Sequence, residues 1–238
     1  MNKMLHLIKG EILRLVRYKI IFFAVLVSAI WVIIIALSDE ATALALGPSL
    51  ILMDAGLMSV ILLGSSFFLE QQEGTLHALL VTPVQLYKVL IAKICSAMFM
   101  GFLSLIIVAG SILIFHGPMI SILPIIFYTF LVILTHTAIG FLLILHSRDF
   151  MAMLVKYMGM VLLFMLPVLL VAVNVVPDEY EFLTLLSPSY AGQVLFQSTV
   201  KTVETWKVIF SVSYLALIPG LLYPLLVYKQ FVKVAIEG

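Results

Sequence analysis

Few side chains within the apolar runs of this sequence could perform acid–base or ligand chemistry. Asp54 stands inside such a run, and an acid there costs on the order of 3 kcal/mol to insert into a membrane, so it is a candidate for a proton or cation pathway. The alternative is an acid that is hydrogen-bonded to a neighbouring helix or hydrated near the outer surface, since no second acid accompanies it. His116 and His136 have no partner at metal-ligand spacing. The sequence therefore predicts no metal site and leaves both interpretations of Asp54 open.

The stretch "EQQEGTLHALLVTPV" (70–84) is a polar interruption that is more organised than a loop requires. Gly74 is suited to end a helix, Thr75 to cap the next one and Pro83 to stop it. This pattern predicts a helix of one to two turns with three apolar side chains, Leu76, Leu79 and Leu80. Two interpretations remain: the turn docks into a groove of another protein, or it lies on the membrane surface against lipid headgroups.

The composition places these residues in an integral membrane protein. Of the 238 residues, 64% are hydrophobic and only 11% are charged, whereas soluble proteins carry about 25% charged residues. The chain has room for several spans but not for a soluble domain with its own core. It contains no G-x-x-x-x-G-K-[ST] sequence, so it has no phosphate cradle of that type and is not expected to be an enzyme that hydrolyses ATP. An energy source would be carried by another chain.

The elements that must position these residues are membrane-spanning helices. Crossing a hydrocarbon core of ~30 Å takes about 20 mostly apolar residues, and each span should be helical because unpaired backbone groups are costly there. Six segments qualify, at about 20–37, 48–69, 88–115, 119–145, 151–176 and 208–228. The fourth is long enough to tilt, or to begin only after Pro124. We therefore expect an all-α integral membrane protein with one permease domain over residues 1–238.

Two further segments are expected to be helical without crossing the membrane. Residues 1–19 carry an apolar stripe opposite the polar residues His6, Lys9, Arg14 and Arg17, which predicts an interfacial amphipathic helix with a basic wet face. Segment 177–207 includes the apolar run "FLTLLSPSYAGQVLF", which Pro188 divides into pieces too short to span. We expect two short helices in the outer leaflet there, buried against protein or lining a cavity.

The distribution of cations predicts the orientation. An odd-even walk through the six spans puts eleven cations on the side of the amino terminus: Lys3, Lys9, Arg14, Arg17, Lys19, Lys88, Lys93, Arg148, Lys156, Lys229 and Lys233. Only Lys201 and Lys207 fall on the other side. The positive-inside rule therefore predicts that both termini are cytoplasmic. Lys93 and Lys156 lie near the cytoplasmic ends of their spans, where snorkelling would explain them.

The ordered set of these features resembles a known family. "EQQEGTLHALLVTPV" followed by "YKVLIAKI" is similar to the segment after the second span of type-2 ATP-binding-cassette (ABC) exporter permeases, where an acidic stretch precedes a short coupling helix. The basic amino-terminal helix, the six spans and "LLSPSYAGQVLF" before the last span extend the resemblance over nearly the whole chain.

The resemblance implies a permease subunit that exports an amphipathic, drug-like or antibiotic-like small molecule across the plasma membrane of a bacterium. It implies two ABC ATPase subunits, which hold the ATP and Mg²⁺, a second permease that is identical or homologous, contact with membrane lipid and no nucleic acid. The residues that it assigns to ATPase coupling are Glu70, Glu73, Gly74, Thr75, His77, Leu79 and Leu80, with a second contact through Lys9, Arg14 and Arg17. The alternatives are a haem or lipid-type exporter permease of the same class and an ion-coupled secondary carrier.

Overall fold

The computed structural model describes residues 3–75, 84–117 and 121–237, and all regular secondary structure in these ranges is helical. Within them, six helices are long and apolar enough to cross a membrane. They extend over Ile20–Leu37, Glu40–Gln72, Leu86–His116, Ile122–Leu145, Phe150–Ala172 and Thr205–Ile236. The expectation of an all-helical fold with six helices able to span a membrane is therefore confirmed.

Each candidate span is built from one to three helical elements. The amino-terminal helix α1 (Lys3–Arg17) is followed by α2 (Ile20–Leu37), and the second span joins α3 (Glu40–Ile51), the π-helical η1 (Leu52–Met58) and α4 (Ser59–Gln72). Three single helices follow: α6 (Leu86–His116), α7 (Ile122–Leu145) and α8 (Phe150–Ala172). Before the last span come η2 (Asp178–Tyr180), α9 (Glu181–Thr184) and α10 (Pro188–Gln197), and that span joins α11 (Thr205–Leu222), η3 (Tyr223–Val227) and α12 (Tyr228–Glu237).

Several span boundaries differ from the sequence prediction, and two of these differences have identifiable reasons. The second span begins at Glu40 rather than at residue 48, because Pro48 lies inside α3 instead of starting it. The Ala- and Leu-rich turns before this proline favour helix, and α3 packs against α6 and α10. The fifth span ends at Ala172 rather than at residue 176. Asn174 follows with a φ of 55°, a left-handed conformation that commonly ends helices and that Asn tolerates.

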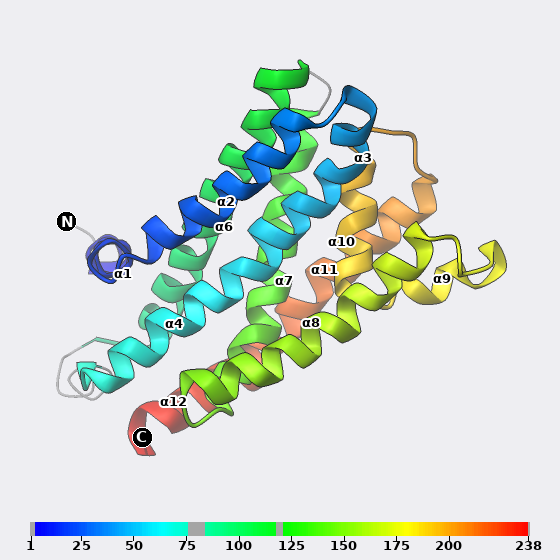
Figure 1. Cartoon of the computed structure of the whole chain (residues 1–238). Coiled ribbons are helices and arrows are strands. Elements are labelled where there is room, and N and C mark those ends of the chain that lie inside the picture. Colours follow the sequence, from blue (N-terminus) through cyan, green and yellow to red (C-terminus); the bar gives the residue numbers. More distant parts are fainter. Residues whose placement is uncertain (1–2, 76–83, 118–120, 238) are drawn as a thin grey trace.

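The spans lie side by side in one bundle (Figure 1). Helices α6 and α7 occupy its centre: α6 packs against α1, α2, α3 and α4, and α7 packs against α4, α6, α10 and α11. Helix α1 is seen end-on in Figure 1 while the spans run across the view, so α1 lies across the bundle rather than along it. The two termini and the end of α4 are at the same end of the bundle.

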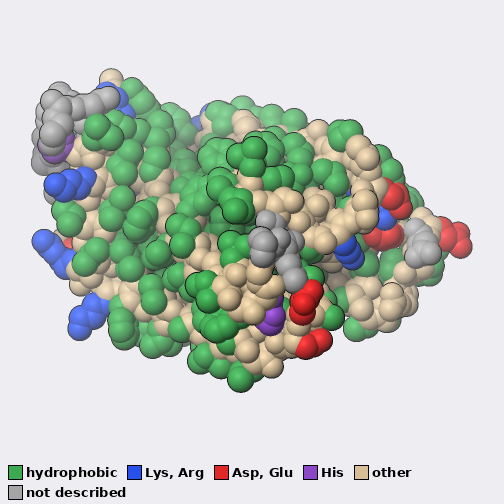
Figure 2. Space-filling view, turned by 90° about the horizontal axis from the view of Figure 1, so that it is seen from above, with side chains coloured by type: hydrophobic (Ala, Val, Ile, Leu, Met, Phe, Trp, Pro, Cys, Tyr) green, Lys and Arg blue, Asp and Glu red, His purple; other side chains and the backbone are tan. Residues whose placement is uncertain are grey.

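The core has two main layers along the bundle, and the outer faces are apolar. One buried cluster gathers around Leu52, Val108 and Phe196, and a second gathers around Phe67, Phe141 and Tyr157. Figure 2 shows hydrophobic side chains over the middle of the molecule, Lys and Arg mainly at one end and Asp and Glu mainly at the other. An apolar belt between charged ends is the surface expected where lipid surrounds the spans.

The segment before the last span folds back into the bundle. Ser187 caps α10 by accepting a bond from the backbone N–H of Tyr190, and Pro188 occupies the first turn, where its missing N–H costs nothing. Every residue from Pro188 to Phe196 is buried, and α10 packs against α7, α8 and α11. The side chain of Gln193 donates to Ser49 Oγ at 2.8 Å. Helix α10 is therefore part of the protein core.

Candidate functional site: a buried ion cluster at the base of the 70–84 segment

Two residues from consecutive spans form the centre of the site. Lys93 Nζ lies 2.6 Å from Glu70 Oε2, and their side chains are 1% and 0% exposed. Glu70 stands in the last turn of α4, and Lys93 stands near the start of α6. Ser66 also donates to Glu70 Oε1 at 3.3 Å. A buried charge is tolerated only when it is paired and hydrogen-bonded, and this geometry meets that requirement for Glu70.

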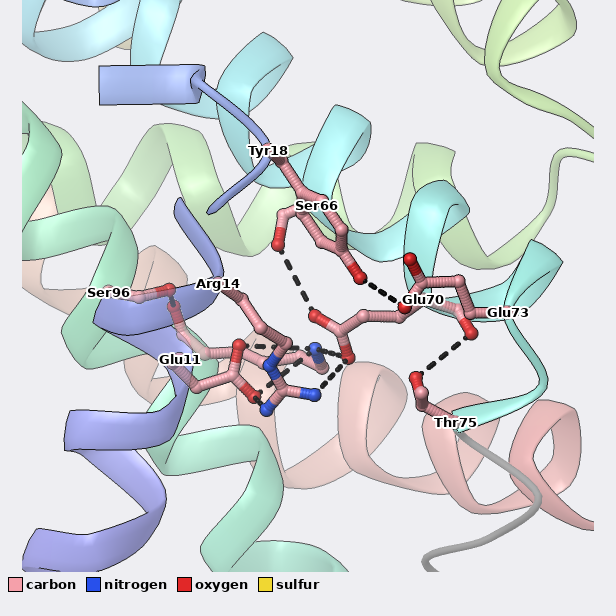
Figure 3. Close-up of polar contacts among 9 residues, drawn as sticks. Glu11, Arg14, Tyr18, Ser66, Glu70, Glu73, Thr75 and Ser96 are labelled. Carbon is pink, nitrogen blue, oxygen red and sulfur yellow. Dashed lines mark hydrogen bonds and ion pairs between the residues drawn. The ribbon is translucent and has the colours of Figure 1, made fainter. Parts of the chain in front are cut away.

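Helix α1 completes the arrangement with a second acid and a second base. Arg14 donates to Glu11 at 2.8 Å and also lies 3.3 Å from Glu70, while Lys93 lies 3.4 Å from Glu11. We call Glu11, Arg14, Glu70 and Lys93 the ion cluster (Figure 3). Its two carboxylates and two cations balance when all four are charged. The cluster joins α1, α4 and α6, which come from three separate parts of the chain.

Burial affects the protonation of the acid on α1. Glu11 is 2% exposed, and desolvation raises its pKa above the usual value, although attraction by Lys93 opposes that shift. Glu70 adds a smaller repulsive contribution, and Arg14 adds an attractive one. Glu11 therefore binds a proton more readily than a solvent-exposed glutamate does.

The chain leaves α4 directly beside this cluster. Helix α4 ends at Gln72, and Gly74 follows with a φ of 67° while its N–H bonds the carbonyl of Gln71. The prediction that Gly74 ends this helix is thus confirmed, since an L side chain would be strained at that φ. The Thr75 hydroxyl donates to the carbonyl oxygen of Glu70 at 3.0 Å, and the helical turn that Thr75 was expected to cap lies outside the described residues.

A tyrosine that follows α1 contacts the residues just after the end of α4. Tyr18 donates its hydroxyl to Glu73 Oε2 at 2.6 Å. Burial and this bond to a carboxylate raise the pKa of Tyr18 to about 12. The link between α1 and α2 is therefore tied to the first residues that follow α4 (Figure 3).

The structure brings some of the expected coupling residues together and separates others. Glu70, Glu73, Gly74 and Thr75 lie at the exit of α4, and the Glu70 side chain is buried in the bundle against Lys93. His77, Leu79 and Leu80 lie outside the described residues. Of the expected second contact, Lys9 and Arg17 are exposed, whereas Arg14 is directed into the ion cluster. Glu70 and Arg14 are thus placed to hold the segment's base.

Two sequence interpretations of charged residues within the spans were wrong. Lys93 does not snorkel, because its ammonium is buried against two acids; Lys156, in contrast, is exposed and donates to the carbonyl of His146. Asp54 is not the sole carboxylate of a span, since Glu70 belongs to the candidate span Glu40–Gln72. Asp54 lies near the middle of that span, in η1.

The histidines within and beside the spans are hydrogen-bonded rather than clustered. His136 is fully buried and bonds the carbonyl of Val132 at 2.8 Å and Ser189 Oγ at 3.1 Å. His116 Nε2 lies 2.9 Å from the carbonyl oxygen of Ile35. Within the ranges that the structure describes, no group of three or more His, Cys, Asp or Glu residues could hold a metal ion.

Glu11 is the functional candidate that the sequence interpretation missed. Leu7, Glu11 and Leu15 recur every four residues, which puts this acid on the face that packs against the bundle. Glu11 on the packing face of a helix, with an Arg three residues later and a Lys near the start of a span, was the sequence pattern that could have indicated a buried ion pair. The partner identities still required knowledge of which helices meet.

Comparisons with known proteins give no family assignment. No protein-family model matches this chain, and no curated protein matches its sequence.

Proposed function

We propose that this chain is the membrane-spanning subunit of an ABC exporter of the type-2 class. Two permease chains, identical or homologous, would enclose the path, and two ATPase subunits would hold ATP and Mg²⁺ below. The chain would lie in the plasma membrane of a bacterium with both termini in the cytoplasm. This proposal rests on the order of the sequence features and on the geometry at the exit of α4.

The observation that supports it best is the ion cluster. It connects the segment 70–84 to three helices, because Glu70 at its start contacts Lys93 of α6 and Arg14 of α1. A force applied to this segment would therefore move α1, α4 and α6 together. Buried ion pairs are weak evidence for added stability, and fixing the register of neighbouring elements is their best-attested use. Such a rigid base suits a segment that transmits motion from a partner.

The surface charge is compatible with the proposed orientation. Lys and Arg gather at the end of the bundle that carries both termini, and Asp and Glu gather at the opposite end (Figures 1 and 2). The same end presents exposed cations of α1, Lys9 and Arg17, which remain available for the proposed second ATPase contact. Arg14 would fix the position of α1 for this contact through its ion pairs with Glu11 and Glu70.

The proposed cargo is an amphipathic small molecule of drug-like or antibiotic-like character. The apolar core of the bundle motivates this class. A haem or lipid-type cargo is the alternative within the same transport mechanism, and ATPase turnover of the purified complex with each compound class would separate them.

The experiment compares insertion, ATPase co-purification and ATP turnover in the same variants. Gly74→Pro should keep insertion but weaken both co-purification and turnover, because proline cannot adopt a φ of 67° and lacks the N–H that bonds Gln71. Leu79→Lys should do the same if Leu79 fills a protein groove, since an unpaired ammonium there is costly. His146→Lys is the control, as this exposed residue lies in the loop between α7 and α8. Normal co-purification and turnover in both test variants would refute the coupling assignment.

A further inference from the structure

The carboxyl group of Asp54 lies buried near the middle of the second span. Its side chain belongs to η1, the π-helical stretch between α3 and α4, and the residue is 2% exposed. Ser28 of α2 donates its hydroxyl to Asp54 Oδ2 at 2.5 Å, and Ser28 is itself fully buried. The contact therefore joins two spans at a depth where no water is expected to reach.

No counter-charge accompanies this acid in the described part of the chain. The ion pairs found there involve other residues. The titratable side chains that face η1 are His136 of α7 and Tyr157 of α8. His136 lies near Gly56 but bonds Val132 and Ser189, and the Tyr157 hydroxyl donates to the carbonyl of Leu57.

The charged side chains on the helices packed against η1 stand toward the ends of those helices. Helices α3, α4, α6 and α8 carry them, and α2, α7 and α10 have none. They are Glu40, Glu70, Lys88, Lys93 and Lys156. Glu70 and Lys93 already pair with each other. An ionised Asp54 would thus be a net charge in a low-dielectric interior, which costs far more than burying the neutral acid.

The polar groups around the carboxyl are neutral. Ser104 of α6 and Trp31 of α2 also direct polar groups toward Asp54. The Trp31 indole N–H is buried and has no hydrogen bond of good geometry among the described residues. Hydroxyl groups can donate or accept, so Ser28 and Ser104 can bond a neutral carboxylic acid as well as a carboxylate. This environment satisfies a protonated acid without requiring a cation.

We propose that Asp54 is a proton-binding site in the middle of the membrane, and that its neutral form joins α2 to η1. The proton is taken up from water by the carboxylate to give the carboxylic acid, and it returns to water when α2 separates from η1 and the group is hydrated. No other reactant is consumed. The occupant is a proton rather than a metal cation because the surrounding groups supply one acid and two hydroxyls, fewer oxygens than a bound cation usually takes. This inference does not depend on the proposed ATPase partner.

Infrared difference spectroscopy of the full chain in lipid vesicles tests the site directly. At neutral pH, the wild-type spectrum should contain a carbonyl band of a protonated, buried carboxylic acid, and Asp54→Asn should lack it. Ser28→Ala removes one hydrogen bond to the carbonyl, so it should move the band to higher frequency without abolishing it. Glu11→Gln is the control for the other buried acid and should leave the Asp54 band in place.

The infrared spectra distinguish a protonated Asp54 from an ionised one. The proposal would be overturned if the spectra of wild type and Asp54→Asn were the same in the region where protonated carboxylic acids absorb. It would also be overturned if Ser28→Ala did not move the band. Loss of the wild-type band on adding NaCl, but not choline chloride, at constant pH would assign the site to a metal cation instead. If Asp54→Asn fails to insert, the Ser28→Ala shift still tests whether the protonated acid is the partner of Ser28.

Discussion

Lys93 and Glu70 stand on two different candidate spans, yet their charged atoms lie 2.6 Å apart with both side chains withdrawn from solvent. Lys93 is also within 3.4 Å of Glu11, so one ammonium serves two acids. Because the three residues come from α6, α4 and α1, this contact fixes the position of the amino-terminal helix against the exit of the second span.

Removing the cation should strongly destabilise the protein. Lys93→Met leaves Glu70 and Glu11 with Arg14 alone, and breaking a buried pair from one side costs about 3–5 kcal/mol. The free energy of unfolding in detergent would show the loss. Lys156→Met is the matched control on an exposed lysine and should change stability by less than about 0.5 kcal/mol.

The double variant Glu70→Met/Lys93→Met tests whether the cost comes from the unpaired charge. It removes one acid and one base, so the cluster remains balanced through Glu11 and Arg14. We expect it to be more stable than Lys93→Met. A double variant that loses as much as the sum of the two single variants would show that the residues do not interact.

Protonation of Glu11 should make stability depend on pH. Because burial raises the pKa of Glu11 above its ordinary value of 4.5, the folded protein takes up this proton at a higher pH than the unfolded chain does. The destabilisation from burying the Glu11 charge is therefore absent below the pKa of Glu11 in the unfolded chain. It grows as the pH rises from that value to the pKa of Glu11 in the folded protein. Glu11→Gln should flatten the rise in unfolding free energy on acidification from neutral pH. Parallel plots of unfolding free energy against pH for wild type and Glu11→Gln would contradict the expectation.

The hydroxyl of Tyr18 can be titrated by ultraviolet absorbance. The difference spectrum between wild type and Tyr18→Phe isolates this one tyrosine and should titrate with a midpoint of about 12, because the group is desolvated and donates to Glu73. Loss of this partly exposed bond should lower stability by roughly 0.5–1.5 kcal/mol. Glu73→Gln should bring the midpoint back toward 10. A wild-type midpoint near 10 would rule out the bond.

Two glycines on α6 provide a matched pair for helix packing. A Cβ at Gly101 would lie 2.3 Å from Ile133 Cδ1 and 2.9 Å from the backbone oxygen of Ala55, whereas nothing lies within 4 Å of a Cβ at Gly110. Gly101→Ala should therefore push α6 from η1 and α7, at a cost of about 1–3 kcal/mol. Gly110→Ala should be neutral or slightly stabilising, since Ala favours helix. Equal thermal stability of the two variants would show that α6 does not pack this closely.

The sequence by itself determined the class of fold and the number of candidate spans. Long apolar runs such as 20–37 must be helical in lipid because their backbone groups have no other partner, and the structure has a helix over that range. The sequence also showed Gly74 as the end of a helix, because the positive φ that favours glycine there is a property of the local backbone. The role of the segment after it stays a prediction, since residues 76–83 lie outside the described ranges.

Only the tertiary structure decided where the charges belong. The positions of Glu11 and Lys93 were plain in the sequence, but whether Lys93 reaches the interface or an acid depends on which helices meet, and 82 residues separate it from Glu11. Pro48 shows the same limit for the backbone: its ring disfavours a helix interior, yet α3 continues through it because the packing of α3 on α6 and α10 compensates. Contacts between distant segments set both outcomes, and local sequence patterns do not specify such contacts.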